Sequence, residues 1–457
     1  MVQRASIDTT RNVDYAYEQY LLAHEKQVIE AIHKFEDKLQ HSSVKYGRFT
    51  IPTYLKPHFI TTKQAKLIHS VCDAIARMVD RICNLYVVDS ALKEIFGLSP
   101  EAEELIKIDP GYSRILSFAR FDGFLEGETL KFIELNGDSP AGMAYADTLE
   151  KYLFEVPELQ DFFSKAYLQR DARSQKLLDA LLGVYEEFGG LETPQIAIVD
   201  WKNVRTRPEF DILKSFFEEK GYKTTIADPR ELRYKSGKLY HGNFRIDLIY
   251  RRVIFNELLE KLRDVNDLIR AYKDRAVCMA NPLRSRLAAS KALLSLLTNP
   301  AYDHLFSAKE NEIKRQHLPW ARRIVDAENF YGGKKGYLID FLKDEKENLV
   351  LKPADNYNAK DVTIGAETRD EDWNLAIDKA LKSNWMVQEF VSPPFMTVPT
   401  VINHKIEFSA KKMNTGCFVF NGTYGGSISR LSDETVVNVS RGGGLVSTLL
   451  CESEINR

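Results

Sequence analysis

Residues 132–142 read Phe-Ile-Glu-Leu-Asn-Gly-Asp-Ser-Pro-Ala-Gly, and this stretch carries the sharpest chemical signal in the chain. Its apolar start is typical of a strand, and the Gly-Asp-Ser-Pro segment predicts a turn. Residues two apart on a strand face the same way, so Glu134 and Asn136 place a carboxylate and an amide oxygen side by side. Magnesium takes one or two such oxygens and completes its octahedron with water and phosphate oxygens. The alternative is a strand with a polar outer face that ends in a turn.

A second polar pair lies upstream, where residues 119–122 read Ala-Arg-Phe-Asp. Short extended runs at 113–121, 124–125 and 129–135 predict a strand cluster, with Glu-Gly-Glu at 126–128 as a hairpin turn. The guanidinium of Arg120 could hold a substrate carboxylate with two hydrogen bonds, and Asp122 could orient it. The alternative is a surface ion pair between the two residues.

Composition limits the classes of protein that remain. The 457 residues suggest about three structural lobes. The 63 basic and 65 acidic residues give a net charge of -2, which argues against nucleic-acid binding. No apolar run is long enough for a membrane span, and the first residues contain no signal-peptide core. The five cysteines form no metal-type spacing, so we expect reduced thiols in a cytoplasmic protein: Cys72, Cys83, Cys278, Cys417 and Cys451.

Hydrophobic periodicity predicts an α/β (α+β) fold in five parts, the clearest helix covering residues 62–86. Strands and helices alternate between residues 195 and 250, as in βαβ units, and mix again after residue 348. The parts are a helical N-terminal region, 1–110; a strand cluster with the metal motif and helices, 111–190; an α/β unit, 191–255; a helical connection with an irregular end, 256–335; and a strand-rich C-terminal part, 336–457.

Two lysines in the second half have the chemistry that phosphate groups require. Lys352 ends the apolar strand predicted at 348–353, and Lys291 lies in a stretch, 284–297, predicted to be helical. An ammonium delivered by an apolar strand suits phosphate oxygens. Either lysine alone is also typical of a solvated surface.

The apolar segment 384–391 predicts a strand whose backbone could read the Watson–Crick face of adenine. Trp385, Met386 and Val391 could then wall the ring. Trp385 and Met386 are equally typical of an ordinary core.

Two further segments could face anions. The apolar strand predicted at 245–250 leads into Arg251 and Arg252, and ligands gather at the carboxyl ends of strands in α/β sheets. We therefore expect one arginine to face a site and the other to face solvent. The glycines at 442–444 could present backbone N–H groups to an anion, or form a flexible turn.

Seven segments in order resemble the circularly permuted ATP-grasp ligases, the group of the glutathionylspermidine synthases and the eukaryotic-type glutathione synthetases. They span about residues 120–444: Ala-Arg-Phe-Asp at 119–122, Glu-x-Asn-x-Asp-Ser-Pro at 134–140, Tyr-Arg-Arg at 250–252, Leu-Lys-Pro at 351–353, Gln-Glu at 388–389, Arg430, and Gly-Gly-Gly at 442–444. In that family the permutation moves the Glu-x-Asn strand ahead of the lysine strands, and it comes first here.

The resemblance implies an ATP- and Mg²⁺-dependent ligase that joins a carboxylate to an amine through an acyl phosphate. Residues 191–255 would form a pre-ATP-grasp substrate domain, and residues 111–190 and 336–457 the ATP-grasp core and lid. The implied roles are catalysis by Arg430, Arg120 and Arg252; substrate binding by Ser139, Arg120 and Arg252; nucleotide binding by Lys291, Lys352, Gln388, Glu389, Val391, Gly442 and Gly443; and metal binding by Glu134, Asn136 and Asn356.

Two positions depart from the family pattern. The loop at 354–361 has no glycine, and Asn356 stands where the family has a metal-binding glutamate. Ser432 stands where glutathione synthetases have a lysine. The partners expected are a small acid and a small amine, with no nucleic acid and no membrane. An alternative is a non-catalytic nucleotide- or peptide-binding protein with a degenerate site. A polyamine substrate would require an acidic pocket, for which Asp200 and Glu209 are the candidates.

Overall fold

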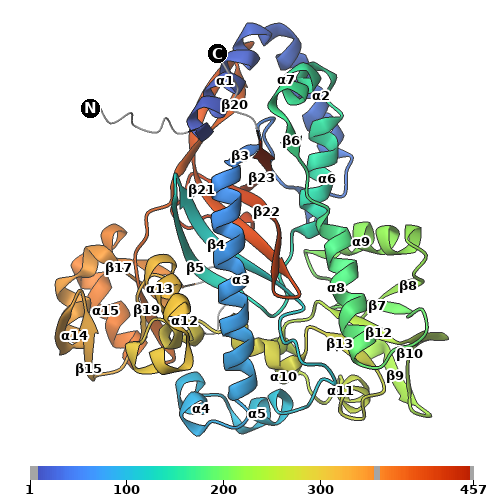
Figure 1. The fold of residues 1–457 in the computed structure, drawn as a ribbon, viewed down its shortest axis with the longest axis vertical. Coiled ribbons are helices and arrows are strands. Elements are labelled where there is room, and N and C mark those ends of the chain that lie inside the picture. The colour runs from blue at the N-terminus through green and yellow to red at the C-terminus, as the bar shows by residue number, and fades with distance from the viewer. Residues whose placement is uncertain (1–8, 355–360, 453–457) are drawn as a thin grey trace.

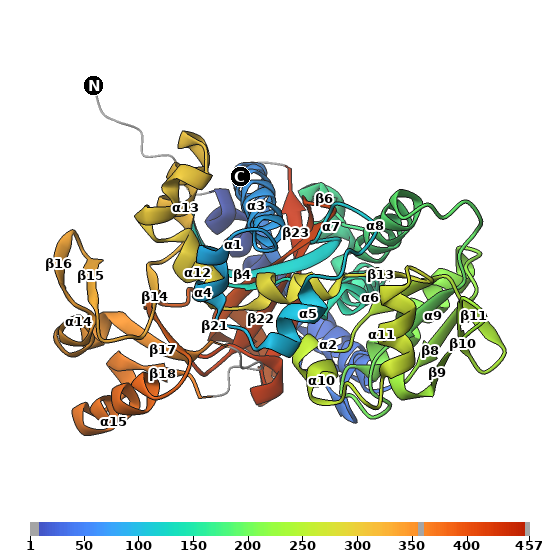
Figure 2. The same cartoon turned by 90° about the horizontal axis from the view of Figure 1, so that it is seen from below.

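A computed structural model describes residues 9–354 and 361–452 and centres on a mixed eight-stranded sheet (Figures 1 and 2). Six strands follow one another in the order β3-β23-β22-β21-β4-β5, while β20 pairs with β21 and β6 with β23. The bounds are β3 (His58–Thr61), β4 (Phe118–Glu126), β5 (Thr129–Asn136), β6 (Leu168–Gln169), β20 (Phe395–Ile402), β21 (Lys405–Phe420), β22 (Thr423–Ser432) and β23 (Gly444–Cys451). Strands from both ends of the chain therefore build this sheet.

The hairpin of β4 and β5 confirms the predicted strand cluster and corrects its bounds. The turn lies at Gly127, which has a φ of 55°, a conformation that glycine adopts without strain. Residues 113–117 are not in a strand, while the runs predicted separately at 113–121 and 124–125 join into one strand. A bulge between Asp122 and Gly123 joins them, and period-2 patterning does not reveal such an irregularity.

Helices cover both faces of the sheet because side chains on β21 alternate between two cores. Cys417 and Val419 pack in one core with α3 (Thr62–Leu85), and Phe418 and Phe420 in another with α6 (Met143–Phe154) and α8 (Arg173–Glu187). A capping box between Thr61 and Gln64 starts α3, so the helix predicted at 62–86 is confirmed.

A second sheet is parallel, with the order β13-β12-β7-β8. Its strands are β7 (Ile196–Val199), β8 (Thr224–Ala227), β12 (Leu248–Arg251) and β13 (Cys278–Ala280), and α9 (Arg207–Glu219) connects the first two. The alternation of strands and helices predicted between residues 195 and 250 is confirmed. The run predicted at 245–250 divides between β12 and β11 (Phe244–Ile246), which pairs in a small sheet with β9 (Leu232–Lys235) and β10 (Lys238–His241).

A third, antiparallel sheet forms the lid, with the order β14-β19-β17-β18. Its strands are β14 (Ala321–Arg323), β17 (Leu349–Pro353), β18 (Thr363–Ile364) and β19 (Trp385–Glu389), and it packs with α14 (Leu338–Asp344) and α15 (Asp370–Leu381). The hairpin β15 (Glu328–Tyr331) and β16 (Lys334–Tyr337) lies beside α14. Sequence patterning missed β14 and β15 because both are short and carry charged residues.

The remaining elements complete the outer layers. In the described residues no helix is long and apolar enough to cross a bilayer. The bounds are α1 (Thr9–Ala23), α2 (Glu25–Gln40), β1 (Lys45–Tyr46), β2 (Phe49–Thr50), α4 (Ser90–Phe96), α5 (Pro100–Ile106), α7 (Gln160–Ala166), α10 (Phe255–Glu260), α11 (Asn266–Lys273), the 3-10 helix η3 (Leu283–Ala289), α12 (Ala292–Leu297) and α13 (Ala308–His317).

Candidate functional site

Two cavities meet on the face of the central sheet that the lid overhangs. The first lies between the lid sheet and the strands β4, β5, β21 and β22, and the second extends from the same strands toward the parallel sheet. Four residues line both cavities: Asp122, Glu134, Arg430 and Asn438. A ligand in one cavity would therefore contact the same side chains as a ligand in the other.

Strand register brings the polar residues of the shared wall together. Asp122 on β4 lies opposite Glu134 on β5 and Gly416 on β21, and Arg120 lies opposite Asn136. Gly416 has no side chain and so leaves space for Arg120 and Asp122, because a Cβ there would lie 2.9 Å from Arg120 Cδ and 3.1 Å from Asp122 Oδ1. The predicted pairing of Glu134 and Asn136 on one face is thus confirmed, and the sheet adds Arg120 and Asp122 to it.

Asp122 is the centre of a buried hydrogen-bond network. Arg120 donates from Nε to Oδ1 at 2.8 Å and from Nη2 to Oδ2 at 3.0 Å. Arg430 Nη2 lies 2.6 Å from Oδ1, and Asn136 Nδ2 donates to Oδ2 at 2.7 Å. Burial favours a neutral acid, but the two guanidinium groups outweigh it and hold the pKa of Asp122 below its usual value. The side chain of Asp122 is 3% exposed, so the surface ion pair considered as an alternative is wrong.

Arg430 keeps part of its guanidinium unpaired. Nη2 donates to Asn414 Oδ1 at 2.6 Å, whereas the buried Nε has no hydrogen-bond partner among the residues that the structure describes. The residue is 9% exposed, and burial lowers its pKa against the opposing effect of Asp122. A buried unpaired N–H group is costly, so an acceptor at this point would be favourable.

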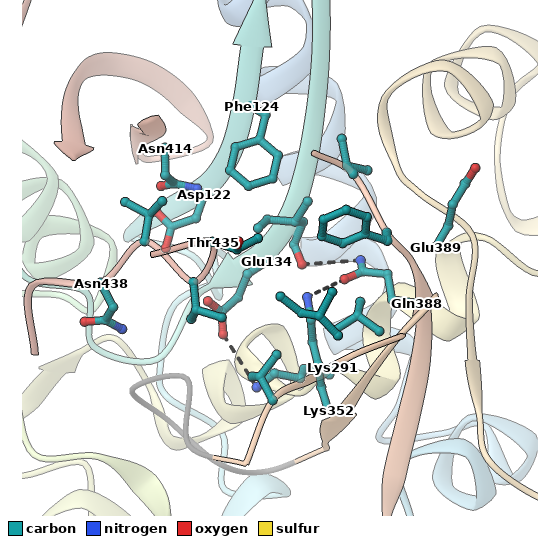
Figure 3. Close-up of a pocket in the computed structure, with 18 of the residues that line it drawn as sticks. Asp122, Phe124, Glu134, Lys291, Lys352, Gln388, Glu389, Asn414, Thr435 and Asn438 are labelled. Carbon is teal, nitrogen blue, oxygen red and sulfur yellow. Dashed lines mark hydrogen bonds and ion pairs between the residues drawn. The ribbon is translucent and has the colours of Figure 1, made fainter. Parts of the chain in front are cut away.

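Lys291 and Lys352 both line the first cavity, although they come from different parts of the chain (Figure 3). Lys291 Nζ lies 3.5 Å from Glu134 Oε1, and Lys352 Nζ donates to Gln388 Oε1 at 2.5 Å. Burial lowers the pKa of Lys352 to about 8; Glu134 opposes this shift and Lys291 adds to it. Lys291 precedes α12 as its N-cap instead of lying inside a helix, so that part of the prediction is wrong.

The segment 388–391 forms the lid side of the first cavity, and Val391 is part of it, as the sequence predicted. Gln388 Nε2 donates to the backbone oxygen of Ile133 at 3.3 Å, which connects lid and central sheet. The side chain of Glu389 turns away from the cavity in Figure 3. Trp385 and Met386 do not line the cavity, and Trp385 belongs to the lid core.

The second cavity contains Arg120, Ser139 and Arg252, all three predicted substrate residues. Ser139 Oγ donates to the backbone oxygen of Arg252 at 2.5 Å, and Arg252 Nη1 donates to the backbone oxygen of Pro140. Arg252 is 3% exposed, and no residue that the structure describes accepts a hydrogen bond from its Nε. Arg252 and Arg430 both line this cavity, so two guanidinium groups face an anionic ligand there.

Arg251, the neighbour of Arg252, is fully buried, so its expected solvent exposure is wrong. It pairs with Asp138 at 2.6 Å and donates from Nε to the backbone oxygen of Asn281 at 2.9 Å. Successive residues on β12 point to opposite faces, so only one arginine can face the cavity. Arg251 and Asp138 instead connect the parallel sheet to the end of β5.

Acidic side chains lie at the far part of the second cavity. Asp200 and Glu257 line it, and Trp201 bridges them by donating its backbone N–H to Asp200 at 2.8 Å and its indole N–H to Glu257 at 2.7 Å. Burial raises the pKa of Asp200 to about 7, although Arg252 opposes the shift. Glu209 does not line the cavity and accepts hydrogen bonds from the backbone of Gly142 and Ala144.

The donor set at Glu134 and Asn136 suits magnesium. Asn136 uses its amide nitrogen toward Asp122, and no residue described donates to its amide oxygen. In the described residues, no three His, Cys, Asp or Glu side chains are grouped so that they could hold a metal ion, and magnesium itself takes only one or two protein oxygens besides water and phosphate. Asn356, the third predicted ligand, lies outside the described residues.

Gly442 and Gly443 line neither cavity. They turn the chain after a 3-10 helix, η7 (Val439–Arg441), with Gly442 at a φ of 87°, and Gly443 N–H donates to the backbone oxygen of Asn438 at 3.0 Å. The residues before them, 435–440, contact the cavities instead. Sequence reasoning missed this segment, as well as Asn414, Phe124, Tyr145 and Glu257, because single polar or aromatic residues carry no spacing signal.

One solved structure shares the fold of this chain. No protein-family model matches the sequence, and no curated protein matches it significantly. A glutathione synthetase-like effector from Globodera pallida has a similar structure, with a TM-score of 0.63 and 14% identity over 93% of this chain and 97% of that one. A candidate gamma-glutamylcysteine synthetase from Methylobacillus flagellatus has a TM-score of 0.43 and 12% identity over 86% of this chain and 89% of that one. The chain therefore has a glutathione synthetase-like α/β fold.

Proposed function

We propose that this chain is an ATP- and Mg²⁺-dependent ligase that joins a small carboxylic acid to an amine. The observation that carries the proposal is the junction of the two cavities at Glu134, Asp122 and Arg430. One cavity has two lysines beside the 388–391 segment of the lid, as a nucleotide requires. The other is lined by the guanidinium groups of Arg120, Arg252 and Arg430, as an anionic substrate requires. Phosphoryl transfer needs both ligands to meet at a positively charged point.

The fold assignment that follows is a circularly permuted ATP-grasp. Residues 111–190 and 336–457 would contribute the core and the lid, and residues 191–255 the pre-ATP-grasp substrate domain. The similarity to the glutathione synthetase-like effector supports this assignment at the level of the fold. The order of the strands also agrees, since β5 with Glu134 precedes β17 with Lys352 along the chain. We also propose that the protein is located in the cytoplasm.

Each residue has a distinct part in the proposed reaction. Lys291 and Lys352 neutralise the phosphates, while the backbone of residues 388–391 holds the base. Arg120 and Arg252 orient the acid in the second cavity, and Ser139 fixes the backbone around Arg252. Arg430 stands between the carboxylate and the γ-phosphate and stabilises the charge that develops there. Glu134 and Asn136 would hold magnesium, which supplies charge neutralisation on the phosphate oxygens when bound.

The chemical steps are two displacements. The substrate carboxylate attacks the γ-phosphorus, the bond to the β,γ-bridging oxygen breaks, and ADP leaves with that electron pair. The amine nitrogen then attacks the acyl carbon of the acyl phosphate, inorganic phosphate leaves, and the nitrogen loses a proton to solvent. The acidic side chains of Asp200 and Glu257 make an ammonium-bearing substrate the best fit for the far part of the second cavity.

Phosphate release from ATP and magnesium tests the proposal across a matrix of amino acids, short peptides and polyamines, with mass spectrometry of the products. We expect release that requires both an acid and an amine and yields an amide of their combined mass less water. The Lys352→Met variant should lose this release. Release without any acceptor, or an unchanged rate in Lys352→Met, would contradict the ligase.

A second candidate function is nucleotide binding without turnover. The observation in its favour is the glycine-free loop at 354–361, where Asn356 replaces a family glutamate. This second candidate function predicts that Mg·ATP binds, as measured by calorimetry, and that no acid–amine pair in the matrix causes phosphate release. The two measurements together separate the candidates.

A further inference from the structure

A pocket on the lid, outside both cavities, has a composition that the proposed reaction does not use. Its lining includes the rings of Trp320, Tyr331 and Phe341 and the carboxylates of Glu345 and Glu389. We call it the aromatic–acidic pocket. It lies at the β15–β16 hairpin and α14, the part of the lid at the left edge of Figure 2.

The three rings come from three separate segments, so only the tertiary structure assembles them. The centroids of Trp320 and Tyr331 are 4.8 Å apart with an interplanar angle of 62°. Those of Tyr331 and Phe341 are 6.1 Å apart at 54°. Trp320 and Tyr331 thus pack edge to face, Tyr331 and Phe341 are tilted against each other, and all three rings line the pocket.

Two contacts fix the orientation of the Trp320 ring. Its indole N–H donates to the backbone oxygen of Phe330 at 2.8 Å, and the guanidinium carbon of Arg322 lies 5.1 Å from its ring centroid. Arg322 donates its own hydrogen bonds to Asn329, Thr298 and Ala321 and pairs with neither glutamate. The ring is therefore preorganised before any ligand arrives.

The two carboxylates leave negative charge beside these rings. Among the described residues, neither Glu345 nor Glu389 forms an ion pair within 4 Å with a lysine, arginine or histidine nitrogen. Glu345 accepts a hydrogen bond from Asn348 Nδ2 at 3.0 Å, and Glu389 accepts one from the Trp320 backbone at 3.3 Å. Burial raises the pKa of Tyr331, and both glutamates add to the shift. Two cations are also present: Lys334 lines the pocket, and the guanidinium of Arg322 lies over the Trp320 ring.

We propose that the aromatic–acidic pocket binds an alkylated ammonium cation, such as a quaternary or methylated amine. Ring faces attract cations, and alkylated ammonium ions are weakly hydrated, so they lose little on entering an aromatic site. An anion would be repelled by Glu345 and Glu389. A hard metal ion gives up its water shell reluctantly, so the apolar ring faces suit it less well than they suit an alkylated ammonium ion. Glu389 lines both this pocket and the first cavity, and its side chain turns away from the first cavity in Figure 3.

Choline and its uncharged isostere 3,3-dimethylbutan-1-ol provide the test, measured by calorimetry and by Trp fluorescence without nucleotide. We expect saturable binding of choline, and binding of the isostere weakened by about two- to thirtyfold. Equal binding of the two, or no binding of choline, would overturn the proposal. A trimethyllysine peptide and its unmethylated form, tested in parallel, distinguish a protein side chain from a free small molecule as the source of the cation.

Variants localise the binding. Tyr331→Leu should abolish choline binding, and Glu389→Gln and Glu345→Gln should each weaken it. Phe330→Leu is the matched control, since Phe330 neighbours Tyr331 on β15, is 57% exposed and does not line the pocket. Unchanged binding in both glutamine variants would overturn the proposal even if Tyr331→Leu failed to fold. The result does not depend on turnover, so it can fail or succeed independently of the proposed function.

Discussion

At the residue scale, Asp122 decides how the junction of the two cavities is built. Its two oxygens accept hydrogen bonds from Arg120 and Asn136, and Arg430 lies within ion-pair distance. Two arginines around one carboxylate leave a net positive charge, which suits a carboxylate or phosphate ligand. The three charged residues and Asn136 therefore act as one unit, and single substitutions should not have additive effects.

Arg430→Ala tests the residue placed at the reacting atoms. Loss of this anion-stabilising donor should lower kcat by about 10²–10³-fold while nucleotide affinity changes little. Phosphate release and calorimetry with ADP give the two quantities. Arg233→Ala is the control, because Arg233 lies on β9 away from both cavities. A normal kcat in Arg430→Ala would remove the residue from the reaction.

Asp122→Asn should destabilise the protein by about 3–5 kcal/mol, because it leaves buried guanidinium groups without their carboxylate. The native pKa of Asp122 lies below its unfolded value. The stability that the network contributes is therefore fully present above about pH 4 and is lost as the pH falls through the native pKa. Urea unfolding between pH 3 and pH 7 checks both points. The variant should show a shallower loss of stability on acidification than the native protein, and an equal loss would contradict the assignment.

The lowered pKa of Lys352 predicts that nucleotide binding depends on pH. Its native pKa of about 8 lies below the ordinary value, so the ammonium loses its proton as the pH rises through 8. A bound phosphate favours the charged form, so ADP affinity should fall by about tenfold between pH 7 and pH 9. Lys352→Arg stays charged over this range and should show no such fall. Calorimetry at several pH values measures the effect; a flat profile in the native protein would show that Lys352 does not contact the nucleotide.

At the scale of the elements, the pairing of β4 with β21 creates the space for the charged network. Asp122 lies opposite Gly416, so β21 passes beneath the Arg120–Asp122 pair without a side chain of its own. The neighbouring bulge at Asp122 and Gly123 bends β4 at the same place. One glycine and one bulge thus help to set the position of three charged groups, Arg120 and Asp122 on β4 and Arg430 on β22.

Gly416→Ala tests this arrangement. The added methyl group would displace Arg120 or Asp122, and overpacking of this kind costs about 1–3 kcal/mol. We expect that loss in urea unfolding, together with reduced turnover. Gly183→Ala in α8 is the matched control, since its Cβ would meet only Asn421 Nδ2, at 3.2 Å, and alanine favours the helix. Unchanged stability and turnover in Gly416→Ala would show that the pair can shift freely.

At the scale of the whole molecule, the first cavity lies between two sheets that few polar contacts join. Gln388 bonds to Ile133 across it, Lys291 N–H to the backbone of Ala354, and Thr298 Oγ1 to the backbone of Ala321 at 3.1 Å. Thr435 after β22 also bonds to Glu367 of the lid. A ligand between the sheets would add contacts to both.

A non-hydrolysable ATP analogue should therefore protect the lid strands. We expect slower amide hydrogen exchange in β17 and β19 and a higher Tm, since ligand binding to the native state stabilises it by mass action. Exchange in β10 and β11, far from the cavity, serves as the internal control. Protection confined to the parallel sheet would place the nucleotide elsewhere.

The amino-acid sequence by itself determined the local chemistry: the alternation that puts Glu134 and Asn136 on one face, the apolar strands that end at Lys352 and Arg252, and the helix at 62–85. These are short-range consequences of periodicity and steric preference. It could not assign Arg251 to the interior, begin α12 after Lys291 or reveal the bulge at Asp122, because each depends on a partner distant in the chain. Only the tertiary structure decided which charges meet at Asp122 and which rings form the aromatic–acidic pocket. The physical reason is that strand register and sheet packing, and not sequence spacing, set the distances between side chains from different segments.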